Sequence, residues 1–243
     1  HLNLISMQNI GTTDRMILSA SMKTYRNTIS GGCIEDSSLN PAYWLSDDCS
    51  NINITFKIDG GSWHFINYTD LRSIIVECEN GGIGIASNSR FLNSSIETGN
   101  AMTGLSFISL DEADVSNSYI DLDKGLLFID DSSFEDCNGD CIRVGKTAPA
   151  YNQSIFINNS TFETTASGAS VHAISLHNAA NTIEIENTQF DDMKSALNGL
   201  PANSVFAPPT NDLLFDNNTI NDYKDWGVFS ESTYFKISNN TIT

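Results

Sequence analysis

The stretch Ile155-Phe-Ile-Asn-Asn-Ser-Thr-Phe162 is the first of four similar phrases in the second half of the chain. Its alternation predicts a strand with Ile155 and Ile157 on one side, a sharp bend at Asn159 and a new inward aromatic residue at Phe162. A phrase that returns at a near-constant period is typical of solenoids. The other three copies are Ile183-Glu-Ile-Glu-Asn-Thr-Gln-Phe190, Leu213-Leu-Phe-Asp-Asn-Asn-Thr-Ile220 and Phe235-Lys-Ile-Ser-Asn-Asn-Thr-Ile242.

Alignment of the bend residues gives one column that runs through the whole chain. Successive bends are 22 to 30 residues apart, except for one gap of 43 residues, where a bend near residues 107–112 lacks the signature. Asn117 fits the phrase but lies only 14 residues before the next bend, so we interpret it as outside the column. The column consists of Asn9, Gly31, Gly60, Asn88, Asp131, Asn159, Asn187, Asn217 and Asn239.

These residue types suit a bend that is repeated at one corner. Asn, Asp and Gly adopt a left-handed backbone at low cost, and stacked Asn side chains can form hydrogen-bonded ladders. An apolar residue three positions after each bend would build a continuous core, as in a parallel β-solenoid. These apolar residues are Trp63, Phe91, Phe134, Phe162, Phe190, Ile220 and Ile242.

On these repeats the chain resembles the right-handed parallel β-helix proteins of the pectin-lyase-like superfamily. The resemblance implies an all-β fold, a right-handed single-stranded parallel β-helix of about ten coils, with residues 1–243 forming a single domain. It implies little about function, because one fold hosts many functions.

Composition narrows the possible partners. The chain has 30 acidic and 12 basic residues, a net charge of −18, which argues against nucleic acid and anionic membrane surfaces as partners. No apolar run is long enough for a transmembrane helix. Few Lys and Arg residues with abundant Asn, Ser, Thr and Asp suit a secreted or cell-surface protein, which is the location we expect.

The two ends of the repeat array lack room for capping elements, since the first bend is at residue 9 and the last at 239. Solenoids normally need caps, and an open strand edge invites pairing with another chain. We expect either a segment of a longer β-helix or a unit that self-associates, stacking end to end or on a partner.

Five cysteines allow two disulfides with one cysteine left over. Cys33 with Cys49 would close an insertion, Cys137 with Cys141 would close a short loop, and Cys78 would remain. Both bonds would fit an oxidising compartment. The alternative is that the cysteines are free and buried in the core.

The first candidate for chemistry is Asp140 with His172. If the apolar residues that follow each of them align, both fall in the same register on adjacent coils, where a carboxylate and an imidazole form an acid/base pair in principle. Arg143 and Lys194 would line the same groove.

This region is similar to the polygalacturonase-type glycoside hydrolases, which carry Asp-Asp-Cys-Ile/Val and, a coil later, Gly-His-Gly-Ile-Ser-Ile. The resemblance implies that Asp140 matches the second Asp, His172 the His, and Lys194 the Lys of a substrate-binding Arg-x-Lys. Gly139 stands in place of the other Asp, so only one of three expected Asp residues is present.

The second candidate is acidic. Residues 111–140 hold ten carboxylates against one basic residue, Lys124. Stacked carboxylates suit Ca²⁺, and Asp131, Asp136 and Asp140 are its candidate ligands. The alternative is a solvated acidic face without a metal.

Together these features favour an extracellular noncatalytic β-helix, adhesin-like or assembly-forming, over an enzyme. The alternatives are a carbohydrate-active enzyme, either a glycoside hydrolase or a calcium-dependent polysaccharide lyase, and a glycan-binding module. Exposed aromatic residues could stack on sugar rings of a polysaccharide. The candidates in or near loops are Tyr43, Trp44, Tyr223 and Trp226.

Overall fold

The computed structural model describes the segments that carry the repeats. They are residues 16–20, 26–34, 54–58, 62–72, 74–78, 82–86, 88–98, 106–145, 153–165, 171–177, 180, 182–198, 210–223, 226–229 and 232–243. Within them no helix has the length and apolar character needed to cross a membrane.

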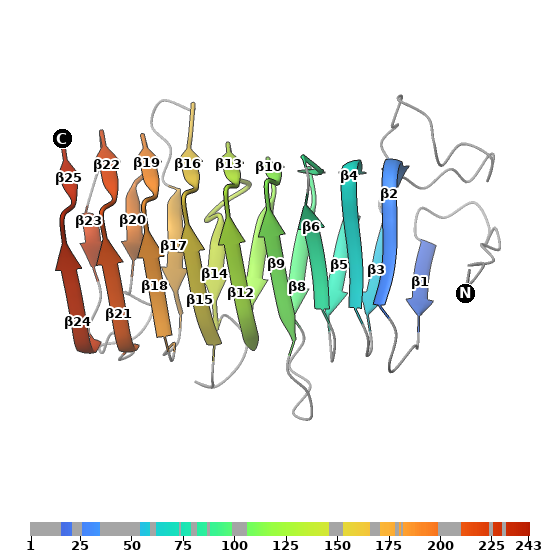
Figure 1. Ribbon diagram of the computed structural model, residues 1–243, viewed down its shortest axis with the longest axis horizontal. Helices are drawn as coiled ribbons and strands as arrows, with labels where there is room; N and C mark the ends of the chain where they lie inside the picture. Colours follow the sequence, from blue (N-terminus) through green and yellow to red (C-terminus); the bar gives the residue numbers. More distant parts are fainter. Residues whose placement is uncertain are drawn as a thin grey trace.

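The strands form three faces of a parallel β-helix, stacked side by side along the long axis of the molecule (Figure 1). The nine-stranded first face contains β1 (Met16–Ala20), β3 (Ile54–Ile58), β5 (Ile74–Cys78), β8 (Ser95–Thr98), β11 (Tyr119–Leu122), β14 (Ile142–Val144), β17 (His172–Leu176), β20 (Ser195–Asn198) and β23 (Trp226–Phe229).

The second and third faces alternate with the first along the chain. The second face contains β6 (Gly82–Ala86), β9 (Phe107–Asp111), β12 (Gly125–Asp130), β15 (Gln153–Asn158), β18 (Thr182–Glu186), β21 (Thr210–Asp216) and β24 (Ser232–Ser238). The third contains β7 (Arg90–Leu92), β10 (Asp114–Ser116), β13 (Ser133–Glu135), β16 (Thr161–Glu163), β19 (Gln189–Asp191), β22 (Thr219–Asn221) and β25 (Thr241–Ile242). The long strands β2 (Arg26–Ile34) and β4 (Ser62–Arg72) run through both of these faces and join them.

The predicted parallel β-helix is therefore the observed fold. The described residues contain seven sequential triplets of strands, from β5 to β25, preceded by two coils in which β2 and β4 span two faces. Each strand pairs in parallel with its neighbours one coil away, as Ile155 of β15 does with Leu127 of β12 and Ile183 of β18.

The core is a stack of inward residues, with aromatic rings at its centre. Phe134 lies 4.6 Å from Phe162 between ring centroids, and Phe162 lies 5.3 Å from Phe190, with the rings nearly parallel. Phe91 and Ile220, at the same position in other coils, are also fully buried. The stack predicted from the sequence is thus present over these coils.

Two residues of that predicted stack differ from the prediction. Trp63 pairs with Ile83 on the second face, and Leu71 is the residue that pairs with Phe91. Ile242 occupies the expected position but is 55% exposed in the last described coil.

The bend column has the left-handed backbone that its residue types favour. Six of its members have φ between 46° and 59°: Asn88, Asp131, Asn159, Asn187, Asn217 and Asn239. The bend that lacked a signature is at Glu112, with φ of 51°.

The early part of the column needs correction. Asn9 and Gly60 lie outside the described residues. Because Asp70 pairs with Arg90, the residue opposite Asn88 is Tyr68 of β4 rather than Gly60. Gly31 lies within the register shift of β2 against β4, between Ser30, which pairs with Ile66, and Gly32, which pairs with Thr69.

A second left-handed corner follows the first after five residues. It includes Asn117, which lies outside the first column, as we interpreted it, but is not coincidental, because it belongs to this second column. The third-face strand between the two corners is only three residues long. The sequence predicted a single column of left-handed bends, and the structure has two. The second corner consists of Asn93, Asn117, Asp136, Asp192 and Asp222.

Side chains at the first corner form two ladders. Outside, Asn217 Nδ2 donates to Asn187 Oδ1 at 2.7 Å, and Asn187 Nδ2 donates to Asn158 Oδ1 at 2.8 Å. Inside, a polar residue that follows a bend accepts a backbone N–H from the previous coil at several coils: Ser132 Oγ from Ala113 N at 3.1 Å, Ser160 Oγ from Ser132 N at 3.2 Å, and Asn218 Oδ1 from Thr188 N at 2.8 Å. The inner ladder matters because a buried N–H without a partner costs about 1–3 kcal/mol.

We expect Asn187→Ala to destabilise the protein more than Asn187→Gly. Both variants lose the outer ladder, worth about 1 kcal/mol per hydrogen bond, but only Ala carries the left-handed cost of about 1–2 kcal/mol. Urea unfolding followed by circular dichroism measures the difference. Equal losses for both variants would show that the backbone conformation is not the reason for Asn at this corner.

Candidate functional site

Asp140 and His172 lie in the same register on adjacent coils, as the sequence predicted. Ile142 pairs with Ile174, and the residues two positions earlier are Asp140 and His172. Asp140 Oδ1 accepts a hydrogen bond from the backbone N–H of His172 at 3.0 Å. The carboxylate therefore binds the backbone of the next coil and helps to start β17.

The imidazole ring of His172 bonds to the coil that follows. Its Nδ1 lies 2.5 Å from Ser195 Oγ, and its Nε2 lies 3.2 Å from Asn198 Nδ2, both on β20. Lys194 lies beside this site, since its backbone N–H donates to the carbonyl of Val171 at 2.8 Å. The ring is thus held by a hydroxyl and an amide.

Arg143 turns toward the coil that precedes it. Its guanidinium forms an ion pair with Asp121 and lies 3.8 Å above the ring centroid of Tyr119. The Tyr119 hydroxyl donates to Glu97 Oε1 at 3.2 Å. Because Arg143 and His172 bond in opposite directions along the stack, the expected set of four residues does not converge on one point.

The disulfide between Cys137 and Cys141 is formed, and it closes the loop that leads into Asp140. Cys78 is buried and unbonded, and burial raises the pKa of its thiol to about 12. Cys49 lies outside the described residues, and the pairing of Cys33 with Cys49 stays a prediction.

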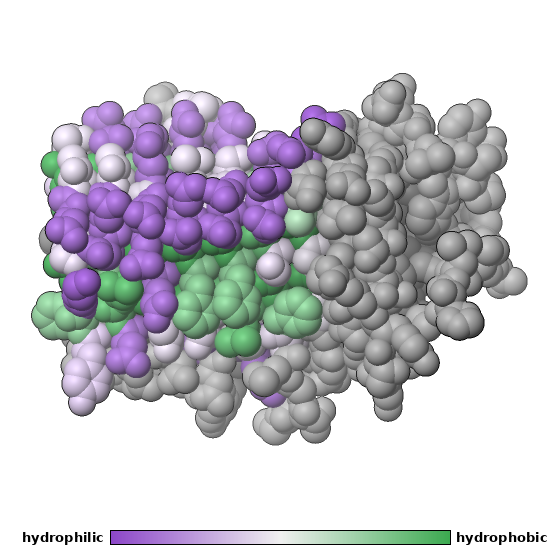
Figure 2. All heavy atoms as spheres, viewed as in Figure 1, coloured by the Kyte–Doolittle hydropathy of each residue, from purple (hydrophilic) through white to green (hydrophobic). Residues whose placement is uncertain are grey.

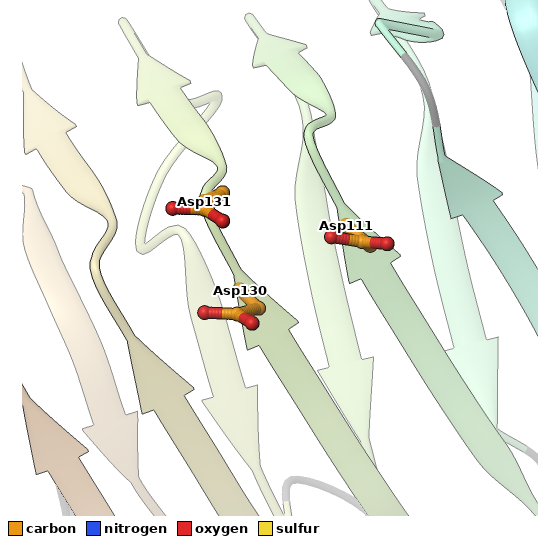
Figure 3. Close-up of side chains that lie close together, drawn as sticks. All are labelled: Asp111, Asp130 and Asp131. Atoms are coloured by element: carbon orange, nitrogen blue, oxygen red, sulfur yellow. The ribbon is translucent and has the colours of Figure 1, made fainter.

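The acidic candidates meet in a different combination from the one predicted. Carboxylate oxygens of Asp111, Asp130 and Asp131 lie within 4.8 Å of one another, and all three residues are exposed (Figure 3). Asp111 and Asp130 are register partners on β9 and β12, and Asp131 is the bend residue that follows. Oxygen ligands of this kind could hold Ca²⁺.

Asp136 and Asp140 do not belong to that cluster. Asp136 lies at the second corner, where its carboxylate accepts hydrogen bonds from Thr165 N and Thr165 Oγ1, both at 2.7 Å. Asp140 bonds to the backbone of the first face. Asp131 and Asp136 are close in sequence but separated in space because strand β13 lies between them.

No family model matches the chain, and neither does any curated protein or solved structure.

The outer surface of the second face carries a feature that the sequence reasoning missed. Figure 2 shows an apolar band across this face beneath a row of polar residues. We call its members the aromatic stripe, defined as Phe107, Leu126, Phe128, Phe156 and Leu214. Strict alternation was the available signal, because Phe128 stands between two inward residues, Leu127 and Ile129.

The aromatic residues suggested earlier lie elsewhere. Tyr43 and Trp44 are outside the described residues. Tyr223 follows the second corner and is 40% exposed, and Trp226 begins β23. None of them belongs to the aromatic stripe.

The pKa of Asp216 is lowered by a hydrogen bond from Ser238 Oγ at 2.6 Å, helped by Asn239 Nδ2 at 2.9 Å and by Lys236 Nζ at 3.6 Å. A lowered folded-state pKa stabilises the fold at neutral pH, and this contribution is lost as the pH falls below the ordinary value of about 3.9. We expect Ser238→Ala to raise the Asp216 pKa in an NMR titration, whereas Ser133→Ala should leave it unchanged. An unchanged pKa in Ser238→Ala would contradict the assignment.

Proposed function

We propose that this protein is a noncatalytic extracellular β-helix, a surface component of the adhesin-like kind. The main support is the way its candidate catalytic carboxylate is used. Asp140 accepts a backbone N–H, and Asp121 and Asp136, the nearby acids, bond to Arg143 and Thr165. Such bonds stabilise a rigid rod, whereas glycoside hydrolysis needs an acid and a base on opposite sides of one bond.

A secreted or cell-surface location fits the covalent chemistry and the charge. The Cys137–Cys141 disulfide is of the kind that persists in oxidising compartments. The net charge of −18 disfavours nucleic acid and anionic membranes as partners.

The resemblance to the pectin-lyase-like superfamily supports a second candidate function, that of a carbohydrate-active enzyme. The observation that favours it is the shared register of Asp140 and His172. If such an enzyme used calcium, the cluster of Asp111, Asp130 and Asp131 would be its candidate ligand set among the described residues.

Self-association is the third element of the proposal. Three apolar residues that continue the inward rows are exposed on β24 and β25: Phe235 at 71%, Ile237 at 51% and Ile242 at 55%. Apolar side chains exposed on the last described coil favour the packing of a further coil, contributed either by another copy or by a neighbouring β-helix segment.

We expect no turnover of polysaccharides. The wild type, Asp140→Asn and the matched variant Asp114→Asn are incubated with neutral and acidic polysaccharides, with and without calcium, and new reducing ends and unsaturated sugars are measured. Asn keeps an acceptor for the His172 N–H, so the fold is retained. Turnover that is lost in Asp140→Asn and kept in Asp114→Asn would establish the enzyme instead.

We expect the wild type to form particles larger than one rod, and Phe235→Ser combined with Ile237→Ser to reduce them to monomers. Light scattering with and without a calcium chelator measures this, and the chelator should have no effect because apolar residues make the contact. Monomers in the wild type would contradict self-association through these strands.

A further inference from the structure

The aromatic stripe lies on a flat sheet surface that faces solvent. Phe128 is 40% exposed, and its ring stacks on that of Phe156 with centroids 5.1 Å apart and planes 10° from parallel. Phe107 lies flat over Gly82, where a Cβ atom would come within 1.9 Å of its ring. The glycine therefore lets the ring lie against the sheet and keeps the surface even.

A polar row runs beside the stripe along the same strands. It lies next to the first corner, and successive coils contribute one residue each in register, a carboxylate or an amide. Figure 2 shows this row as a continuous hydrophilic band above the apolar one. Its members are Asp111, Asp130, Asn158, Glu186 and Asp216.

The stripe ends in a shallow hollow of about 310 Å³. Leu214 belongs to both the stripe and the hollow, and Tyr234, which is 71% exposed, adds a further aromatic ring. Glu184, Asp212 and Lys236 place charged groups around it. The hollow thus repeats the combination of apolar and polar groups found along the stripe.

We propose that the aromatic stripe binds one extended chain of a neutral polysaccharide, lying along the long axis of the β-helix. The proposal rests on the noncatalytic surface function proposed above and names its partner. Sugar rings present apolar C–H faces that pack on aromatic rings, and their hydroxyl groups point outward at the edges. Here those hydroxyl groups would donate to the carboxylates and amides of the polar row.

The dimensions fit one chain better than a second copy of the protein. The stripe is two outward rows wide, about 7 Å between rows, and spans about 20 Å from β9 to β21. Glu184 of β18 stands between Phe156 and Leu214 in one of these rows. Such a strip offers on the order of 200 Å², whereas a stable protein interface buries about 800 Å² on each partner.

The chemistry fits a sugar better than a peptide. The backbone groups of the second face are used in pairing between coils, so a peptide lying on this face would find no backbone partners. The acidic row repels anionic polymers such as polyuronates. A neutral chain with hydroxyl donors avoids both problems.

Affinity electrophoresis and titration calorimetry with xylan, mannan and soluble cello-oligosaccharides test this proposal. We expect the wild type to bind at least one of them. The double variant Phe128→Ala with Phe156→Ala should bind with an affinity lower by about tenfold or more. Tyr223→Ala is the matched control, because Tyr223 has the same exposure as Phe128 and lies off the stripe. Phe128→Trp keeps a ring at this position and should retain binding.

Other outcomes would overturn the proposal. These are no binding of any neutral polymer by the folded wild type, binding that the double variant does not weaken, and a wild-type dimer that Phe128→Ala dissociates, which would make a second copy the occupant. Reducing ends are measured in the same samples. If the wild type cleaves the polymer and its binding depends on Phe128, the noncatalytic function is refuted and the binding site is kept. If it cleaves the polymer and its binding does not depend on Phe128, both proposals are refuted.

Discussion

The left-handed corner between the second and third faces is the constraint on which the rest of the structure depends. Asn159, Asn187 and Asn217 take the same backbone conformation at the same position in successive coils. Asn217 bonds to Asn187, and Asn187 bonds to Asn158, the neighbour of Asn159. Behind this corner, Asn218 accepts the buried backbone N–H of Thr188. Because the corner recurs without slippage, it sets the register of the strands on both sides.

The second corner turns this repeat into a closed coil. It follows after only three residues of strand, so five of the described coils bend twice with left-handed residues before they reach the first face, whereas the coil of Asn159 has the first left-handed bend alone. The short third face places one inward residue per coil at the centre, which is why Phe134, Phe162 and Phe190 stack ring on ring. The corners and the aromatic core thus support one another.

Register also decides which polar residues meet. Asp111 and Asp130 are far apart in sequence but paired across β9 and β12, whereas Asp131 and Asp136 are close in sequence and separated by a strand. The same alternation that buries Leu127 exposes Phe128, and it lines up the aromatic stripe beside the polar row. The surfaces proposed for binding are therefore products of the repeat itself.

The sequence by itself determined the repeat, the parallel β-helix, most of the first corner and the register of Asp140 with His172, because these depend on local residue types at a fixed period. It could not show that Glu112 bends like an Asn, that Asn117 belongs to a second corner, or that Arg143 turns to Asp121 while His172 turns to Ser195. Those outcomes depend on which coils become neighbours and on the direction of each side chain. Only the tertiary structure decides both, because the free energy of packing and hydrogen bonding between coils outweighs local preference.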